Sequence, residues 1–193
     1  MGGSSIHGVI ISNLKKYVEE KLGEDAWDTL RDKAGLPGKA FIPISMYPDS
    51  DLEDLLAAAV EVTGQGRDEI LKDFGAWVIP PLMKMYRSFI PDDWDAVTFL
   101  KNIDDRIHER VVRMKDANAK PPHINVSEIS PGLLEVEYQS HRDMSYLALG
   151  CVYGVAEYYG QKAALMEEKR VVGTHRTFIM RISAAEQTQR DAV

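Results

Sequence analysis

Three polar side chains at two-residue spacing, Tyr138, Ser140 and Arg142, are the clearest candidates for chemistry in this sequence. In a β-strand, side chains two positions apart point to the same face, so these three would stand in one row. Two hydroxyls and a guanidinium in a row suit an anionic group that carries several oxygens. On spacing alone, an ordinary solvated strand end is the favoured explanation of the row.

The strand expected to hold this row covers residues 133–142. Its alternation puts Leu134 and Val136 on the same face as Tyr138, while the reverse face is mostly polar. A purely structural strand is expected to stay apolar along its buried face. Here that face changes from apolar to hydrogen-bonding along its length, which keeps the functional alternative open.

A second candidate is His108, on a long helix predicted from about residue 93 to about residue 115. The apolar stripe of this helix consists of Ile103, Ile107, Val111 and Met114, and His108 lies at its edge. A lone histidine in such a place is usually a core or boundary residue, so the residues alone do not make it a ligand.

The sequence Tyr-Gln-Ser-His-Arg at 138–142 resembles the Tyr-x-Ser-x-Arg motif of the haem nitric oxide/oxygen binding (H-NOX) family. This family contains bacterial sensor domains related to the sensory domain of soluble guanylate cyclase. The resemblance extends over about residues 6–183. It includes a His-Gly-x-Ile opening at His7, a Gly-Glu-Asp-x-Trp segment ending at Trp27, and an Asp-Asp-x-x-His segment ending at His108.

The resemblance implies a haem b (iron protoporphyrin IX) cofactor and assigns roles around it. Tyr138, Ser140 and Arg142 would hold the haem propionates, and His108 would be the axial iron ligand. Near His108 the spacing is one residue longer than in some relatives, which a local bulge would absorb. The further residues implied near the haem are Pro122 or its neighbour Pro121, which would press on the macrocycle, and the packing residues Met144 and Leu149, for which plain core packing is the alternative.

The family positions that set the choice of gas are apolar in this sequence. Oxygen-binding relatives carry a tyrosine five residues after the arginine that holds the propionates, supported by polar residues on two other helices. These three positions map to Leu147, Leu14 and Val78. Because bound oxygen draws negative charge from ferrous iron, it needs a nearby donor more than nitric oxide does. We therefore expect nitric oxide to bind in a dry pocket that discriminates against oxygen, with carbon monoxide a possible further ligand.

The family's mechanism implies how the signal leaves the domain. Nitric oxide weakens the bond to the opposite iron ligand, so the iron–His108 bond breaks, the haem relaxes and one lobe shifts against the other. No output domain is recognisable in the sequence. The expected partner is a separate effector protein, such as a histidine kinase, a diguanylate cyclase or a chemotaxis receptor.

The pattern of helices and strands predicts an α+β fold: an N-terminal helical lobe, then a lobe with a four-stranded antiparallel sheet and helices, with haem between them. We expect one sensor domain over residues 1–193, with a helical lobe at about 6–65, a haem-ligand and sheet lobe at about 66–183 and a tail at 184–193. Helices are expected at 7–22, 26–34, 50–64, 68–78 (broken or kinked at Pro80-Pro81), 93–115 and 145–159, and strands at 124–129, 133–142, 164–168 and 177–182. Gly75 and Gly150 resemble glycines that let helices of the family approach closely.

Composition limits the possible partners. The 193 residues carry a net charge of −7, without the basic patch that nucleic acid or an anionic membrane attracts, so we expect neither as a partner. The single cysteine, Cys151, excludes an internal disulfide and any cysteine cluster. No apolar run reaches the roughly twenty residues that span a bilayer, and there is no signal pattern, so a cytoplasmic protein is expected.

Two other classes of function serve as alternatives. An enzyme is not expected, because no peroxidase-like His–Arg pair, Ser-His-Asp spacing, P-loop or dinucleotide-binding glycine pattern is present. A non-catalytic binding module of the same fold, holding another hydrophobic or tetrapyrrole ligand, remains the alternative to the gas sensor.

Overall fold

The computed structural model describes residues 5–104 and 122–185, and the structural statements below refer to these residues. The fold is α+β, which confirms the predicted class. The helices are α1 (Gly8–Leu22), α2 (Ala26–Lys33), α3 (Asp49–Thr63), α4 (Arg67–Met85), the short 3₁₀ helix η1 (Arg87–Phe89), α5 (Ala96–Ile103) and α7 (Ser145–Tyr158). The strands are β1 (Ser5–His7), β2 (Met46–Pro48), β3 (His123–Ser130), β4 (Leu133–Gln139), β5 (Gln161–Arg170) and β6 (Arg176–Ala184).

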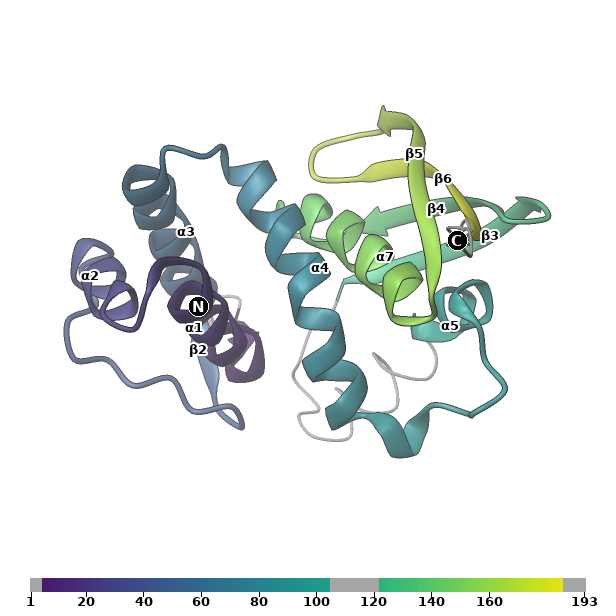
Figure 1. Cartoon of the computed structure of the whole chain (residues 1–193). Coiled ribbons are helices and arrows are strands. Elements are labelled where there is room, and N and C mark those ends of the chain that lie inside the picture. Colours follow the sequence, from purple (N-terminus) through teal and green to yellow (C-terminus); the bar gives the residue numbers. More distant parts are fainter. Residues whose placement is uncertain (1–4, 105–121, 186–193) are drawn as a thin grey trace, which may run out of the picture.

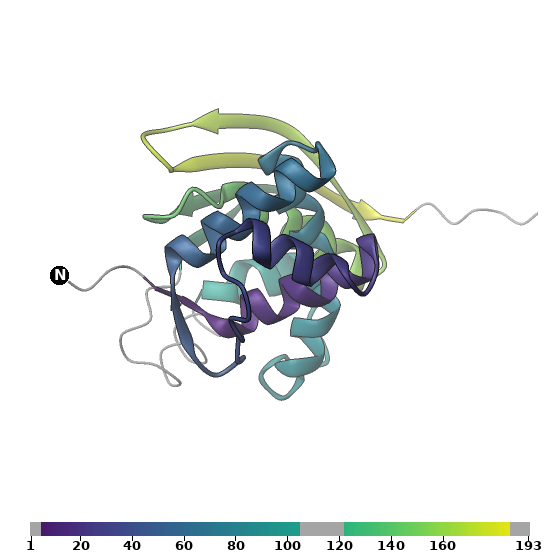
Figure 2. The same cartoon turned by 90° about the vertical axis from the view of Figure 1, so that its left-hand side faces the viewer.

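Helix α4 lies between the two lobes. On one side of it are α1, α2 and α3, and on the other side α7 separates it from the sheet (Figure 1). Seen from the helical lobe, α1, α2 and α3 lie in front of the rest of the molecule (Figure 2). Leu71 and Phe74 of α4 belong to the core of the helical lobe, whereas Ile79 and Met83, further along the same helix, belong to the core under the sheet. One helix therefore joins two hydrophobic cores.

The sheet has the order β3-β4-β6-β5 with every neighbouring pair antiparallel. In β4 the alternation is as predicted: Leu134, Val136 and Tyr138 are buried, and the residues between them are partly exposed. However, β4 ends at Gln139, so the prediction of a strand through Arg142 is wrong. The Ser140 Oγ accepts the Arg142 backbone N–H at 3.2 Å, a local turn that competes with strand pairing.

Helices α4 and α7 approach so closely that glycine is needed at the contact. A β-carbon at Gly75 would lie 2.3 Å from the Leu147 carbonyl oxygen, and one at Gly150 would lie 2.1 Å from the Lys72 carbonyl oxygen. Both distances are far shorter than a van der Waals contact. The backbones of the two helices therefore pack directly on each other at these positions, as the family resemblance implies for this glycine pair.

The prolines of α4 do not end the helix, which continues to Met85, so the predicted end near Val78 is wrong. Pro80 has no backbone N–H to give to the carbonyl of Ala76, four residues earlier. That carbonyl faces α7 at a third glycine, because a β-carbon at Gly154 would lie only 2.5 Å from the Ala76 oxygen. Packing of the backbone on Gly154 and burial of Ile79 together hold the helix across the prolines.

Other boundaries differ more modestly. The short β1–β2 pair was not predicted, and β5 and β6 are longer than expected. Helix α5 begins at Ala96 because the Asp95 carboxylate accepts the Thr98 N–H at 2.8 Å as an N-cap. The predicted continuation of this helix to about residue 115 lies outside the described residues. No helix among the described residues is long and apolar enough to cross a membrane.

Candidate functional site

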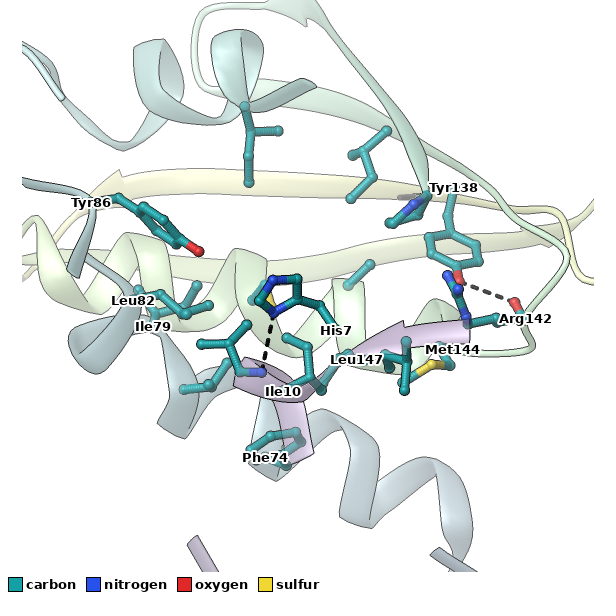
Figure 3. Close-up of a pocket in the computed structure, with 18 of the residues that line it drawn as sticks. His7, Ile10, Phe74, Ile79, Leu82, Tyr86, Tyr138, Arg142, Met144 and Leu147 are labelled. Atoms are coloured by element: carbon teal, nitrogen blue, oxygen red, sulfur yellow. Dashed lines mark hydrogen bonds between the residues drawn. The ribbon is translucent and has the colours of Figure 1, made fainter. Parts of the chain in front are cut away.

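A cavity of about 230 Å³ lies where the two cores meet, between α1, α4, α5, α7 and the sheet (Figure 3). Its walls are almost entirely apolar, with side chains such as those of Ile10, Phe74 and Leu82. Among the described residues, the polar ones that line it are few: Ser5, His7, Tyr86, Tyr138, Arg142 and the thiol-bearing Cys151. The cavity therefore suits a largely apolar molecule with polar groups in a few defined places.

The Arg142 guanidinium marks one end of the cavity. Its Nε donates to the Asp49 Oδ1 at 3.0 Å, and its Nη2 donates to the Ser5 carbonyl at 2.6 Å. The Arg142 backbone carbonyl accepts from the Tyr138 hydroxyl at 3.0 Å. Burial raises the pKa of the Tyr138 phenol, which keeps it a neutral donor. We call this group of Ser5, Asp49, Tyr138 and Arg142 the clamp end.

Asp49 connects the helical lobe to the clamp end through its contact with Arg142. It is the first residue of α3, where a negative side chain is favoured by the helix dipole. Its Oδ2 lies 3.1 Å from the His141 Nε2, while its Oδ1 holds Arg142. One carboxylate from the helical lobe therefore contacts two consecutive residues of the loop between β4 and α7.

Most of the site residues predicted from the sequence meet at this cavity. Those that line it are Val78, Pro122, Tyr138, Arg142, Met144 and Leu147. Three others do not line it: the Ser140 hydroxyl accepts within its own turn, Leu14 is buried in the core of the helical lobe, and Leu149 is buried in the core under the sheet. His108 and Pro121 lie outside the described residues, although Ile103 and Pro122, on either side of that gap, both line the cavity.

Three polar residues at the site are not identified by the sequence pattern. It marks Asp49 only as part of a helix start, and His7 only as the opening of the first helix. His7 accepts the Val9 N–H on its Nδ1 at 3.3 Å, so it is the N-cap of α1. A histidine directly before an apolar helix was the available signal for His7. Tyr86, at the end of α4, gave none; burial raises the pKa of its phenol.

Four apolar side chains from α1, α4 and α7 form one side of the cavity; we call Ile10, Phe74, Val78 and Leu147 the apolar wall. The thiol of Cys151, one helical turn after Leu147, lines the same cavity. Burial raises the pKa of this thiol to about 12. A group at this wall is therefore held in its neutral form, in contrast to the charged groups of the clamp end.

The residues present fit a haem. A haem is a flat ring with two apolar faces and two carboxylates at one edge. The cavity has apolar walls, with a guanidinium and a buried phenol at one end. Asp49 already places a carboxylate on the Arg142 guanidinium, which is the type of pair that a haem carboxylate makes. The residue expected to bind the iron, His108, lies outside the described residues.

Comparisons with solved structures show the same fold. An H-NOX protein from S. oneidensis in the Fe(II)NO ligation state superposes with a TM-score of 0.83 at 20% identity, covering 92% of this chain and 99% of that one. The Fe(II) unliganded H-NOX protein from K. algicida superposes with a TM-score of 0.80 at 22% identity, covering 95% of this chain and 100% of that one.

Two curated relatives are parts of much longer proteins. Soluble guanylate cyclase 89Da of Drosophila melanogaster is 25% identical over 163 residues, which are 80% of this chain and 24% of that protein. Soluble guanylate cyclase gcy-31 of Caenorhabditis elegans is 24% identical over 146 residues, 71% of this chain and 20% of that protein. The chain thus spans about a quarter or less of the relatives that it matches.

The family itself is shown by a sequence match that covers most of the chain. The family described as Haem-NO-binding matches residues 7–167, which run from the N-cap of α1 into β5 and include every described residue of the clamp end except Ser5. This chain therefore belongs to the Haem-NO-binding (H-NOX) family of haem-binding sensor domains.

Proposed function

We propose that this protein is a sensor that holds haem b in the cavity, binds nitric oxide at ferrous iron, discriminates against oxygen, and signals to an effector protein by releasing His108 from the iron. The observation that carries the proposal is an apolar cavity that ends on Tyr138 and Arg142. We further propose that residues 1–193 act as one sensor domain, with the two lobes at about 6–65 and 66–183 and a tail at 184–193.

The clamp end would hold the carboxylates of the cofactor. Arg142 has its guanidinium oriented by Asp49 on one edge and by the Ser5 carbonyl on another. Two fixed contacts reduce the side-chain entropy that binding a carboxylate would otherwise cost. The Tyr138 hydroxyl donates to the Arg142 carbonyl in this structure and would turn from it to a carboxylate as a neutral donor, since burial raises the pKa of the phenol. When bound, the haem supplies the iron that takes up the gas.

Discrimination between gases is supported by the apolar wall. Val78 and Leu147 stand at two of the three positions where oxygen-binding relatives are expected to carry donors, and both line the cavity. Leu14, at the third position, is an apolar residue of the core behind it. Nitric oxide depends less on a donor than oxygen does, so a wall of this kind favours nitric oxide.

The two lobes offer a route for the signal. Direct backbone packing at Gly75 and Gly150 joins α4 to α7, and the Asp49–Arg142 ion pair joins α3 to the loop before α7. Release of His108 would remove one attachment between the haem and the protein. The two lobes would then favour a different relative position, which is a shift in the populations of two conformations. We propose that a histidine kinase, a diguanylate cyclase or a chemotaxis receptor reads this shift; the two curated relatives are named as guanylate cyclases.

The test is the absorption spectrum of the purified protein and of His108→Ala. We expect a Soret band that shifts on adding nitric oxide but not on exposure to air. His108→Ala should change the spectrum, and added imidazole should restore it. His175→Ala, at the turn before β6, is the matched control and should leave the spectrum unaltered.

Two results would contradict the proposal. A spectrum that is the same in His108→Ala would remove the ligand assignment. A colourless protein after expression with ample haem would instead favour the binding module for another hydrophobic molecule.

A further inference from the structure

The loop between β4 and α7, residues 140–144, carries Arg142 and is attached to the sheet lobe through its backbone. The Thr174 hydroxyl, in the turn between β5 and β6, donates to the Ser140 carbonyl. The Tyr138 hydroxyl donates to the Arg142 carbonyl at 3.0 Å. Two carbonyls of the loop are therefore bound by side chains of the sheet lobe.

A third carbonyl of this loop is bound from the other side, by Arg67 at the start of α4. The Arg67 Nη1 donates to the Asp143 carbonyl oxygen at 2.6 Å, and its Nη2 donates to both carboxylate oxygens of Glu53 at 2.9 Å. One guanidinium therefore joins the loop to α3. Because the guanidinium is planar, the fixed angle between its donors sets the direction of both contacts.

Helix α3 thereby reaches the loop twice. Asp49 and Glu53 are four residues apart, so their side chains lie on one face of the helix. Asp49 binds the Arg142 guanidinium directly at 3.0 Å. Glu53 acts on the next residue, Asp143, through Arg67. Two consecutive residues of the loop are thus attached to two successive turns of α3.

We propose that Arg67 is a positioning residue of the clamp end, which keeps Arg142 in place for a carboxylate and passes movements of α3 to it. The inference rests on the proposed function, because it requires a haem carboxylate at Arg142. When Tyr138 turns to that carboxylate, the loop loses its contact at the Arg142 carbonyl, whereas the bond from Arg67 to the next carbonyl remains. Arg67 does not line the cavity, so it acts only through the loop.

The exposure of this ion pair separates positioning from a role in stability alone. The side chain of Arg67 is 29% exposed and that of Glu53 is 46% exposed. Ion pairs in such places contribute little to the free energy of unfolding. Loss of Arg67 should therefore leave the fold in place while it loosens the loop, so that an effect on bound haem can be measured in a folded protein.

The experiment compares Arg67→Met with the wild type in the haem-bound protein. Methionine keeps an unbranched side chain but removes every donor. We expect haem to dissociate about threefold to tenfold faster, the range for loss of one hydrogen bond, and the resonance Raman band of propionate bending to shift. Arg67→Lys should recover most of the retention, because one ammonium can donate to both acceptors.

Glu53→Gln tests the link to α3 separately. It leaves the contact between Arg67 and the Asp143 carbonyl but weakens the attachment of the guanidinium to α3. The propionate band should therefore shift in the same direction as in Arg67→Met, by a smaller amount.

Arg31→Met is the matched control. The Arg31 Nη2 lies 2.9 Å from the Asp28 Oδ1, and its Nη1 donates to the Lys39 carbonyl at 3.3 Å. These are the same kinds of contact, made on α2, on the side of the helical lobe away from α4 (Figure 1). Arg31→Met should leave haem dissociation and the propionate band close to those of the wild type.

Unchanged haem dissociation and an unchanged propionate band in Arg67→Met would overturn the inference. It would also be overturned by a change in Arg67→Met without any in Glu53→Gln, or by an equal change in Arg31→Met, which would reflect general loosening of the lobe. If the wild type takes up no haem, the proposed function fails together with this inference. A wild type that binds haem and nitric oxide while the Arg67 and Glu53 variants match it overturns the inference alone.

Discussion

The clamp end and the apolar wall are parts of one cavity that treat charge in opposite ways. At the clamp end, the charged Arg142 side chain is held by Asp49 and by the Ser5 carbonyl. These partners lie far from Arg142 in the sequence. At the apolar wall, the nearby Cys151 thiol is kept neutral by burial, with a pKa raised to about 12. The comparison teaches that one cavity can offer two kinds of recognition: directed ionic hydrogen bonds at the clamp end, and exclusion of water and charge at the apolar wall. In the proposed function these would meet the rim and the centre of the haem.

The largest effect is expected at the clamp end. Arg142→Ala removes a cation whose side chain is only 10% exposed. It would leave the Asp49 carboxylate beside the haem carboxylates that the clamp end is proposed to hold. Truncating one partner of such a pair typically costs about 3 kcal/mol, so haem should dissociate about a hundredfold faster. The transfer of haem to an excess of apomyoglobin, followed by absorbance, measures this rate.

Two variants show whether the loss comes from the clamp itself. Arg181→Ala removes a partly exposed arginine that contacts the Pro131 carbonyl, and it should leave the rate unaltered. Removing both charges in Arg142→Ala with Asp49→Ala should recover part of the loss, because the unpaired carboxylate is gone. A haem dissociation rate that is the same in Arg142→Ala and the wild type would show that the clamp end does not hold the cofactor.

The next effect concerns pH at the apolar wall. The Cys151 thiol ionises near its ordinary pKa of 9.0 when the chain is unfolded, but near about 12 when it is folded. Between these values only the unfolded chain loses the proton, so stability that is fully present below about pH 9 falls as the pH rises, by up to about 1.4 kcal/mol per pH unit.

Urea unfolding of the haem-free protein at about pH 8 and about pH 10.5 measures this difference, and Cys151→Ala is the comparison because the other ionisable groups are unchanged. The wild type should lose more stability than Cys151→Ala, by about 2 kcal/mol. Equal losses in the two proteins would mean that the thiol is not held neutral in the folded state.

A donor introduced into the apolar wall should weaken the contrast between the two ends. Leu147→Tyr places a hydroxyl at the position where oxygen-binding relatives carry a tyrosine, and we expect oxygen affinity to rise about tenfold, the value of a single hydrogen bond. Leu147→Phe adds the ring without the hydroxyl and is the matched control. Oxygen titrations of the ferrous proteins measure the effect. A similar gain in both variants would attribute it to the size of the ring instead of hydrogen bonding.

The smallest effect is expected from neutralising the bridge between the lobes. Asp49→Asn keeps the size of the side chain but weakens its contacts with Arg142 and His141, and the haem-free protein should lose about 1 kcal/mol of unfolding free energy. Asp28→Asn is the control, because the Asp28–Arg31 pair is at the surface, with the Asp28 side chain 72% exposed. If both variants unfold at the same urea concentration as the wild type, the bridge contributes nothing to stability.

How much of this molecule could be predicted depends on how local each signal is. The alternation in β4 predicted the burial of Leu134, Val136 and Tyr138, because a strand packed on one side must alternate. The end of β4 was not predictable from the pattern, since it is set by a hydrogen bond of the Ser140 side chain. The helix through Pro80 was missed for a different reason, because a tertiary contact outweighs the local preference of proline.

In the site, too, local patterns could be predicted from the sequence and contacts between distant residues could not. Tyr138 and Arg142 are four residues apart and form a motif, so they could be found in the sequence. Asp49 lies 93 residues from Arg142, and nothing in the spacing of the chain indicates that the two will meet. His7 and Tyr86 were missed because each is a single polar residue among apolar ones, and only the fold brings them to one cavity.

Pro80 leaves the Ala76 carbonyl without its usual helical donor. This carbonyl can therefore report on its surroundings through its infrared frequency. A ¹³C label on this carbonyl would give an infrared band separated from those of the other amides. Because a β-carbon at Gly154 would meet the Ala76 oxygen at 2.5 Å, the frequency of that band depends on how near the backbone of α7 lies. Sliding or parting of α4 and α7 during a signalling event could thus be followed in real time without attaching a dye.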